Sequence, residues 1–320
     1  MLRRLKGDGV SIIFISHALE EALEISDRIT ILRDGEWVVT DDTTKFNREK
    51  IIKAMVGRTL SEELYRYQSE AETRKPGKKV LSVRDISKGN MVRNTSFSVF
   101  EGQITGVFGL VGSGRTETFK VISGIDKRDF LRGGKIELND KPVRYYTPHE
   151  AIGGGIVYVT ENRKTEGIFE TMTIGENIFA GFLASGRKNG WIIRLKYLQK
   201  LAGKWIKELN IKTINKNARV VELSGGNQQK TVIAKSLTQE PCIIIFDEPT
   251  HGVDVGSIGE IHQMINKLAD KGIAVVVISS HLPEIMNLSD RILVCRQGRI
   301  VEEFSPAETT EEEIMYAAVH

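Results

Sequence analysis

The sequence predicts an α/β fold with a mixed central sheet, an antiparallel β subdomain and a helical subdomain. Two apolar runs of strand length, 104–108 and 242–246, are each followed at once by residues that carry chemistry. A glycine-rich stretch, 109–114, lies between the first run and a helical pattern, which is the context that a phosphate-binding loop requires. At 320 residues and 40% hydrophobic, the chain is long enough to bury such a core.

Composition excludes several function classes. The net charge of +3 is too small to favour nucleic acid as the main partner. Only Cys242 and Cys295 are present, so we expect no disulfide framework and a reducing compartment. No apolar run approaches the roughly 18 residues that a membrane helix needs. We therefore expect a soluble chain whose membrane role, if it has one, comes through a partner.

The first elements in chain order are short. The apolar run 10–16 reads as a buried parallel strand, followed by a helix over 18–25. A strand over 28–33, a turn at Asp34-Gly35 and a strand over 36–39 form a predicted hairpin. A further helix is predicted over 48–56.

An internal repeat gives the domain organisation. The segments 15–17, 26–29 and 34–35 recur as 278–281, 289–292 and 297–298, and the helix 48–56 recurs as 311–319. We therefore divide the chain into the C-terminal remnant of a first unit (1–57), a polar linker (58–79) and a complete second unit (80–320) with a short C-terminal helix.

The complete unit alternates between strand and helix patterns. Its antiparallel β part is expected near 80–105 and 135–145, and another strand over 156–159. Its helical part is expected near 173–237, where Thr173 and Glu176 have the spacing of a capping box.

The glycine-rich loop is a candidate phosphate cradle, because glycines let backbone N–H groups wrap an anion at a helix N-terminus. A hydroxyl at the end of the loop would be placed on Mg²⁺. The position that usually holds lysine is arginine here; it keeps the charge but carries it on a bulkier planar group. The candidate nucleotide-binding residues of this loop are Gly109, Leu110, Val111, Gly112, Ser113, Gly114, Arg115 and Thr116.

A second loop precedes the other apolar strand. Ser224 is a plausible N-cap, and the loop's N–H groups make a candidate anion site formed by Ser224, Gly225, Gly226, Asn227 and Gln228. Alone, this stretch would read as an ordinary glycine-rich turn before a helix. However, the strand 242–246 follows closely and ends in Asp247 and Glu248, which would hold Mg²⁺ and orient or deprotonate a water. The alternative is that these acids cap the next helix.

Together, 223–230 and 242–250 resemble the signature loop and Walker B strand of an ATP-binding cassette (ABC) ATPase. The sequences of 55–58, 161–164 and 247–256 are similar to those of ATPase subunits of ribose/galactose/xylose-type ABC importers, in which one polypeptide carries two cassettes. The resemblance covers essentially the whole chain. It implies a P-loop NTPase fold, with 80–320 as the second cassette and 1–57 as the tail of the first, whose earlier part is missing.

The resemblance also implies the remaining site residues. ATP and Mg²⁺ are the expected cofactors, and Glu161 stands where the family has glutamine, as a nucleotide and metal contact. Val253-Asp254 fits the loop that communicates across the cassette dimer. In register with the repeat, His17 corresponds to Ser280, so Ser280 is the expected γ-phosphate sensor. A one-residue slip would instead make His281 the switch, and both residues stay candidates beside the catalytic Glu248.

The function implied is ATP hydrolysis that powers import of a monosaccharide. The expected partners are a membrane permease docking around 162–182, a periplasmic or extracellular sugar-binding protein acting through it, and another ABC cassette, but no nucleic acid. The chain would lie peripherally on the cytoplasmic face of the membrane. Its signature loop is intact and its phosphate side is degenerate, so the isolated chain is expected to hydrolyse ATP weakly.

Two other functions remain open. A nucleoside importer ATPase would carry near-identical motifs, and the sequence does not identify the substrate. A nucleotide-binding regulatory half that never hydrolyses is favoured by Arg115, Glu161 and Ser280, whereas Glu248 argues against it because a sensor needs no base there.

Overall fold

The computed structural model describes residues 2–15, 19–33, 36–47, 50–51, 54, 73–130, 133–186, 195–213 and 217–320. These form two compact units, one of residues 1–71 with 254–260 and one of residues 72–253 with 261–320. The two are described separately below.

The first unit is small. Its elements are α1 (Leu2–Gly7), α2 (Leu19–Ile25), β1 (Arg28–Arg33), β2 (Glu36–Asp42) and the 3₁₀ turn η1 (Thr43–Lys45). β1 and β2 pair in antiparallel fashion, which confirms the predicted hairpin. Ile29, Ile31 and Ile51 are buried at its centre. This is a modest cluster, in keeping with the small number of residues that surround it.

The strand predicted over 10–16 is wrong. Residues 10–15 form no strand, and Ile13 and Ile15 are 94% and 93% exposed. A parallel strand needs hydrogen-bonded neighbours and a covering on both faces; among the described residues, β1 and β2 pair only with each other. His17, the turn at 34–35, most of the helix 48–56 and the linker up to residue 72 lie outside the described residues.

The second unit is built on a six-stranded mixed sheet in the order β12-β11-β5-β10-β9-β8. All neighbours are parallel except the β11–β12 hairpin. The central strands are largely apolar, as strands covered on both faces usually are, and every residue of β5, β9 and β10 is buried. The strands are β5 (Ile104–Phe108), β8 (Ile156–Val159), β9 (Ile243–Asp247), β10 (Ala274–Ile278), β11 (Arg291–Arg296) and β12 (Arg299–Phe304).

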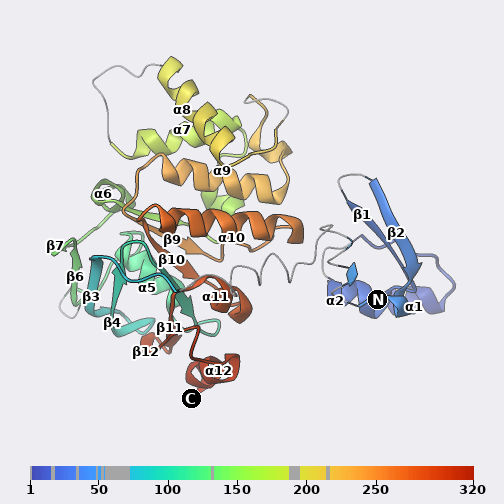
Figure 1. Cartoon of the computed structure of the whole chain (residues 1–320), viewed down its shortest axis with the longest axis horizontal. Coiled ribbons are helices and arrows are strands. Elements are labelled where there is room, and N and C mark those ends of the chain that lie inside the picture. The colour runs from blue at the N-terminus through green and yellow to red at the C-terminus, as the bar shows by residue number, and fades with distance from the viewer. Residues whose placement is uncertain are drawn as a thin grey trace. The chain divides into compact units, whose positions relative to one another are not determined.

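A four-stranded antiparallel sheet and a helical part complete the unit (Figure 1). The predicted antiparallel subdomain is confirmed as β4-β3-β6-β7, with β3 (Lys79–Lys88), β4 (Val92–Phe100), β6 (Lys135–Leu138) and β7 (Lys141–Val143). The capping box of Thr173 and Glu176 is also confirmed, at the start of α7. The helices are α5 (Arg115–Ile122), α6 (Pro148–Gly154), η2 (Arg163–Gly167), α7 (Ile174–Ala184), α8 (Leu195–Glu208), η3 (Val220–Glu222), α9 (Gly225–Leu237), α10 (Val255–Asp270), α11 (Leu282–Leu288) and α12 (Glu311–Val319).

The repeated sequence folds into matching elements. α2 and α11 cover corresponding residues, and β1–β2 and β11–β12 are both antiparallel hairpins. A register shift interrupts the first hairpin between Ile31 and Leu32 and the second between Val294 and Cys295, which are corresponding positions in the repeat. The resemblance between the two segments therefore extends to backbone irregularities.

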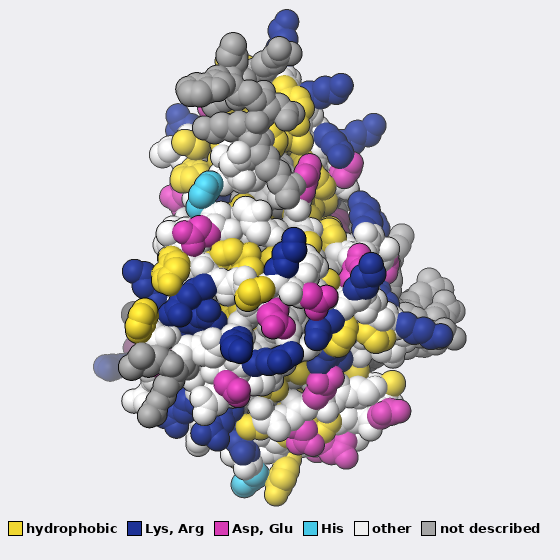
Figure 2. Space-filling model, turned by 90° about the vertical axis from the view of Figure 1, so that its left-hand side faces the viewer, with side chains coloured by type: hydrophobic (Ala, Val, Ile, Leu, Met, Phe, Trp, Pro, Cys, Tyr) yellow, Lys and Arg dark blue, Asp and Glu magenta, His cyan; other side chains and the backbone are white. Residues whose placement is uncertain are grey.

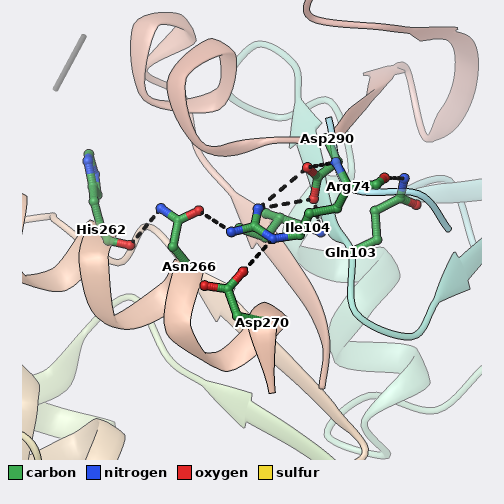
Figure 3. A network of polar contacts seen from close by, with 7 residues as sticks. All are labelled: Arg74, Gln103, Ile104, His262, Asn266, Asp270 and Asp290. Carbon is green, nitrogen blue, oxygen red and sulfur yellow. Dashed lines mark hydrogen bonds and ion pairs between the residues drawn. The ribbon is translucent and has the colours of Figure 1, made fainter. Parts of the chain in front are cut away.

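Arg74 attaches the end of the linker to the second unit (Figure 3). Its backbone N–H donates to Asp290 Oδ1 at 3.0 Å, and its guanidinium donates to Asp270 Oδ1 and Asn266 Oδ1, each at 2.8 Å. Asp290 also accepts from the N–H of Ile104 at 2.7 Å, and Ile104 begins β5. One side chain thus joins the linker, α10 and the strand that leads to the glycine-rich loop.

The surface is mixed in character. The face that carries the antiparallel sheet presents Lys and Arg side chains interspersed with acidic and hydrophobic ones (Figure 2). Among the described residues, no helix is both long and apolar enough to span a bilayer.

Candidate nucleotide-binding site

The glycine-rich loop 109–114 connects β5 to α5 in a conformation that only glycine fits easily. Gly114 has φ +92° and is the N-cap of α5, and a Cβ there would lie 2.3 Å from the carbonyl oxygen of Met91. At Gly109, a Cβ would lie 2.3 Å from the carbonyl oxygen of Cys295. The loop is therefore packed tightly from behind, while Leu110 and Val111 are exposed. A helix N-terminus with an open, glycine-rich approach is suited to an anion.

Arg115 turns back across this loop instead of extending from it. The side chain is buried, and Nη1 donates to the carbonyl oxygens of Gly109 at 2.5 Å and Ser279 at 2.9 Å. Nη2 lies 3.4 Å from Glu248 Oε1. The planar guanidinium can bridge several acceptors at once, which an ammonium cannot do in the same way. Arg115 thus ties the loop to the strand ends and neutralises the carboxylate proposed as base.

Asp247 ends β9 and faces the start of α5. Thr116 Oγ1 donates to Asp247 Oδ1 at 3.1 Å, and the Tyr158 hydroxyl donates to Oδ2. Burial raises the pKa of Asp247 to about 6; the hydrogen bonds from Tyr158 and Thr116 oppose this shift, and the charges of Glu161 and Glu248 add to it. The carboxylate is therefore costly to ionise in this arrangement and would gain from a nearby cation.

Glu248 is fixed by the neighbouring strand. It has φ +47°, a region that non-glycine residues adopt rarely, and its N–H donates to the Ile278 carbonyl oxygen at 2.8 Å. Its Oε1 accepts from the backbone N–H of Ser280 at 2.7 Å, and its Oε2 from Ser279 Oγ at 3.3 Å. The backbone turn aims this carboxylate at the loop after β10, where the candidate sensors lie.

Both candidate sensor residues belong to the short connection between β10 and α11. Ser280 and His281 are exposed. His281 is the N-cap residue of α11, and the backbone N–H of His281 donates to Ser279 Oγ at 3.1 Å. The structure brings the backbone of Ser280 into direct contact with Glu248, while the sensor role of either side chain stays a prediction.

The oxygen atoms around Asp247 suit a hard cation. Thr116 and Asp247 lie side by side, and Glu161, two residues after β8, is close enough for its charge to act on the pKa of Asp247. In the described part of the chain, no three His, Cys, Asp or Glu side chains form a cluster that could hold a metal alone. Mg²⁺ usually takes only one or two carboxylates from a protein, and water and substrate phosphate supply its other ligands. The small number of protein oxygens at this site therefore fits Mg²⁺.

The predicted serine–diglycine stretch lies on other elements: Ser224 follows η3, and Gly225 to Gln228 form the first turn of α9. Ser224 is the N-cap residue of α9, as predicted, but its Oγ accepts from the Asn227 side chain at 3.0 Å instead of from the helix backbone. Ser224 is exposed, Gly225 and Asn227 are half-buried, and Gly226 and Gln228 are buried. The loop therefore offers its serine edge to the surface and anchors the rest of its residues within the unit.

Sequence reasoning missed three residues of these two sites. Tyr158 holds Asp247, Ser279 contacts both Arg115 and Glu248, and Arg163 contacts Gln228 and the backbone after Thr250. Tyr158 left a usable signal, since it is a hydroxyl-bearing residue within a four-residue apolar strand that pairs with the strand ending in Asp247. Arg163 lies in the stretch 161–164 that resembles importer ATPases, but the sequence alone gives it no role. The other two contacts depend on how separate loops meet.

Comparison with known proteins decides the family. The ABC transporter family profile matches residues 92–251, half of the chain, and this range includes the phosphate loop, the serine–diglycine loop, Asp247 and Glu248. The chain belongs to the ABC transporter family. Its fold is that of an ABC ATPase cassette: it superposes with a TM-score of 0.64 on a nucleotide-free ATP-binding cassette from an ABC transporter, at 26% identity, covering 76% of this chain and 96% of that one.

Curated relatives of this ABC chain are import ATP-binding proteins. It is 44% identical over 318 residues to the ribose import ATP-binding protein RbsA of Bacillus licheniformis, covering 99% of this chain and 63% of that protein. It is 43% identical over 325 residues to the xylose import ATP-binding protein XylG of Thermoanaerobacter pseudethanolicus, with coverages of 99% and 63%. The chain thus spans 63% of the length of these relatives.

Proposed function

We propose that the chain is an ATP-binding and hydrolysing subunit that energises import of a monosaccharide of the ribose, galactoside or xylose class through a membrane permease. The observation that carries this proposal is the convergence of the phosphate loop, Thr116, Asp247 and Glu248 at the ends of parallel strands. The printed functions of the ribose and xylose import relatives support the substrate class.

In this proposal, the residues of the chain divide the work as follows. The backbone of 109–114 binds the phosphates, and Thr116, Asp247 and Glu161 hold Mg²⁺, which would neutralise phosphate charge when bound. Glu248 orients or deprotonates the attacking water. Ser280 or His281 contacts the γ-phosphate. Arg115 competes with this role of Glu248, because their ion pair withdraws the carboxylate from a water.

The proposed partners are another ABC cassette, a membrane permease and a sugar-binding protein. The signature residues Ser224 to Gln228 would face an ATP held by the phosphate loop of another cassette, and the exposed Ser224 is consistent with this. The permease would dock near residues 162–182, and a sugar-binding protein would act through it. The chain would then work peripherally, on the cytoplasmic face of the membrane.

A nucleotide-binding half that does not hydrolyse ATP is the second candidate, and one observation favours it. The Arg115–Glu248 ion pair, at 3.4 Å, joins the two residues whose separation hydrolysis would need. In this version, the chain contributes its signature loop to catalysis elsewhere and binds ATP only as a structural or regulatory ligand.

Binding and turnover measured separately test both versions. We expect ATP binding that is tightened by Mg²⁺, little phosphate release by the chain alone, and turnover once a second cassette and the permease are reconstituted with it. Brisk turnover by the purified chain at low concentration would overturn the requirement for a second cassette. In the reconstituted transporter, a Glu248→Gln change that leaves turnover unaltered would favour the non-hydrolysing half.

A further inference from the structure

Arg163 is a buried cation that none of the roles above uses. It begins η2, two residues after Glu161, and its side chain is only 8% exposed. A buried guanidinium is costly unless hydrogen bonds satisfy it, so its partners indicate what its position stabilises.

The partners of Arg163 belong to two other segments. Nη1 donates to the carbonyl oxygen of His251 at 2.7 Å, and Nη2 to that of Gly252 at 2.6 Å. Nε lies 3.5 Å from Gln228 Oε1, and Gln228 Nε2 in turn donates to the Leu223 carbonyl oxygen at 3.1 Å. One guanidinium therefore contacts the loop after Walker B directly and reaches the signature loop through Gln228, which in turn bonds to Leu223.

The glycines facing Arg163 show how closely these segments meet. A Cβ on Gly225 would lie 2.9 Å from Arg163 Nη2 and 3.0 Å from the Gly252 carbonyl oxygen. The guanidinium and the Gly252 carbonyl oxygen packed behind the first glycine of the signature loop therefore leave little room for a larger side chain, independently of any phosphate in front of it.

We infer that Arg163 is a positioning residue that holds the signature loop (223–228) and the loop after Walker B (251–253) in one fixed arrangement. The inference rests on the proposed function, in which the signature loop is presented to ATP on a neighbouring cassette. Because Arg163 begins η2, two residues after Glu161, a displacement of η2 would move both loops together. Lysine could not replace it, since a single ammonium does not present two parallel donors to successive carbonyl oxygens.

Hydrogen exchange on the full chain tests the inference without requiring hydrolysis. We expect Arg163→Lys to speed amide exchange in both 223–228 and 251–253 by about tenfold or more, since charge-assisted bonds to both segments are lost. The melting temperature should fall by only a few degrees, and the ATP affinity of the chain's own phosphate loop should stay within a few-fold of the wild type. Arg84→Lys, an exposed arginine on β3, is the matched control and should change neither loop.

A double-mutant cycle approaches the same contact from the other side. Gly225→Ala should speed exchange in 251–253 in the wild-type background, because the added methyl pushes against the guanidinium. The same change should have a smaller effect in an Arg163→Met background, where the guanidinium is absent and only the Gly252 carbonyl oxygen stays close to the added methyl. Additive effects, or faster exchange confined to one loop, would overturn the inference.

A separate measurement distinguishes failure of the inference from failure of the proposed function. ATP-dependent association with a second cassette, measured by ultracentrifugation in a Glu248→Gln background, should weaken by about tenfold with Arg163→Lys. If the parent chain shows no such association while the exchange results hold, the cassette pairing is wrong and the positioning role stands. If association occurs and Arg163→Lys leaves it unchanged, the positioning role has no bearing on nucleotide presentation and is rejected.

Discussion

Arg115 is the residue at which this cassette departs most from an ordinary phosphate loop. Its guanidinium bonds to the carbonyl oxygens of Gly109 and Ser279 and pairs with Glu248. A lysine at this position would still be cationic but could not make the same fork of contacts. The chemistry of the site therefore depends on whether a bound nucleotide displaces this side chain.

The variant Arg115→Lys is expected to hydrolyse ATP faster than the wild type, by about tenfold in the assembled two-cassette protein, because Glu248 is released and a compact charge can reach the phosphates. Phosphate release measured at saturating ATP checks this. Arg115→Lys combined with Glu248→Gln is the control and should be inactive. A rate below that of the wild type would show that the guanidinium assists the reaction.

The pH dependence of stability should show the cost of ionising Asp247. Its pKa is raised from 3.8 to about 6 on folding, so the folded state binds its proton more tightly and stability falls as pH rises between these values. Asp247→Asn removes the charge and should stabilise the nucleotide-free chain at neutral pH by up to about 3 kcal/mol. The difference should shrink as the pH falls and vanish only well below 3.8, where Asp247 is protonated in both the folded and the unfolded state.

Urea unfolding of the wild type and Asp247→Asn across this pH range, without Mg²⁺, provides the measurement. Asp41→Asn is a useful comparison, because a hydrogen bond from Lys45 lowers the pKa of Asp41 and the trend should not be shared. A stabilisation by Asp247→Asn that persists unchanged at low pH would contradict the electrostatic cause.

Some residues of the candidate site could be singled out from the sequence and others could not, for a physical reason. The phosphate loop, Asp247 and Glu248 could be predicted because each motif is contiguous and its chemistry depends on local backbone geometry. Tyr158 and Ser279 reach the same carboxylates from other strands, through pairings that a single sequence does not specify. The order of the strands in the sheet, and hence these contacts, is a tertiary property.

Among the elements, the segment that contains Arg74 is anchored by several polar contacts. The side chain of Arg74 bonds to Asp270 and Asn266, and both its backbone and its side chain reach the buried Asp290. Burial raises the pKa of Asp290 in spite of the bonds from Ile104 and Arg74. Removing the arginine side chain would leave the buried Asp290 carboxylate without this cationic partner.

Arg74→Ala should therefore lower the free energy of unfolding by about 2–4 kcal/mol, somewhat less than the roughly 3–5 kcal/mol for breaking a fully buried pair, because the Arg74 side chain is 23% exposed. Arg84→Ala removes a surface pair of 3.8 Å with Glu137 and should cost less than about 1 kcal/mol. Chemical denaturation of both variants makes the comparison. Equal effects would mean that the Arg74 contacts contribute no more than an exposed ion pair.

The success and failure of the predicted strands have one explanation. The antiparallel subdomain and the β5 strand were predicted where hydrophobic patterns also find partners in this chain. The apolar run 10–15 has the same pattern, yet it stays exposed. Strand propensity is realised only through pairing and burial, so pattern alone could not distinguish the two cases.

At the scale of the whole molecule, the two units have separate hydrophobic cores. One cluster draws on residues from 80 to 295, and the small cluster around Ile31 involves only residues of the first unit. We therefore expect each core to form without residues of the other.

A chain of residues 72–320 is expected to fold and to bind ATP with the affinity of the full chain, since the phosphate loop, Asp247 and Arg74 are all retained. Isothermal titration and thermal melting of this shorter chain provide the check. Loss of nucleotide binding, with its helical content intact, would show that the first 71 residues contribute to the site.

The matching register shifts of β1–β2 and β11–β12 carry a consequence for how such repeats are encoded. β11 has a second neighbour, β5, whereas within the described residues β1 has β2 alone, yet both hairpins bend at the same place. The register shift is therefore a property of the hairpin sequence and does not depend on pairing with a further strand. Replacing residues 291–305 with residues 28–42 would test whether the sheet of the second unit accepts the repeated hairpin in place of its own.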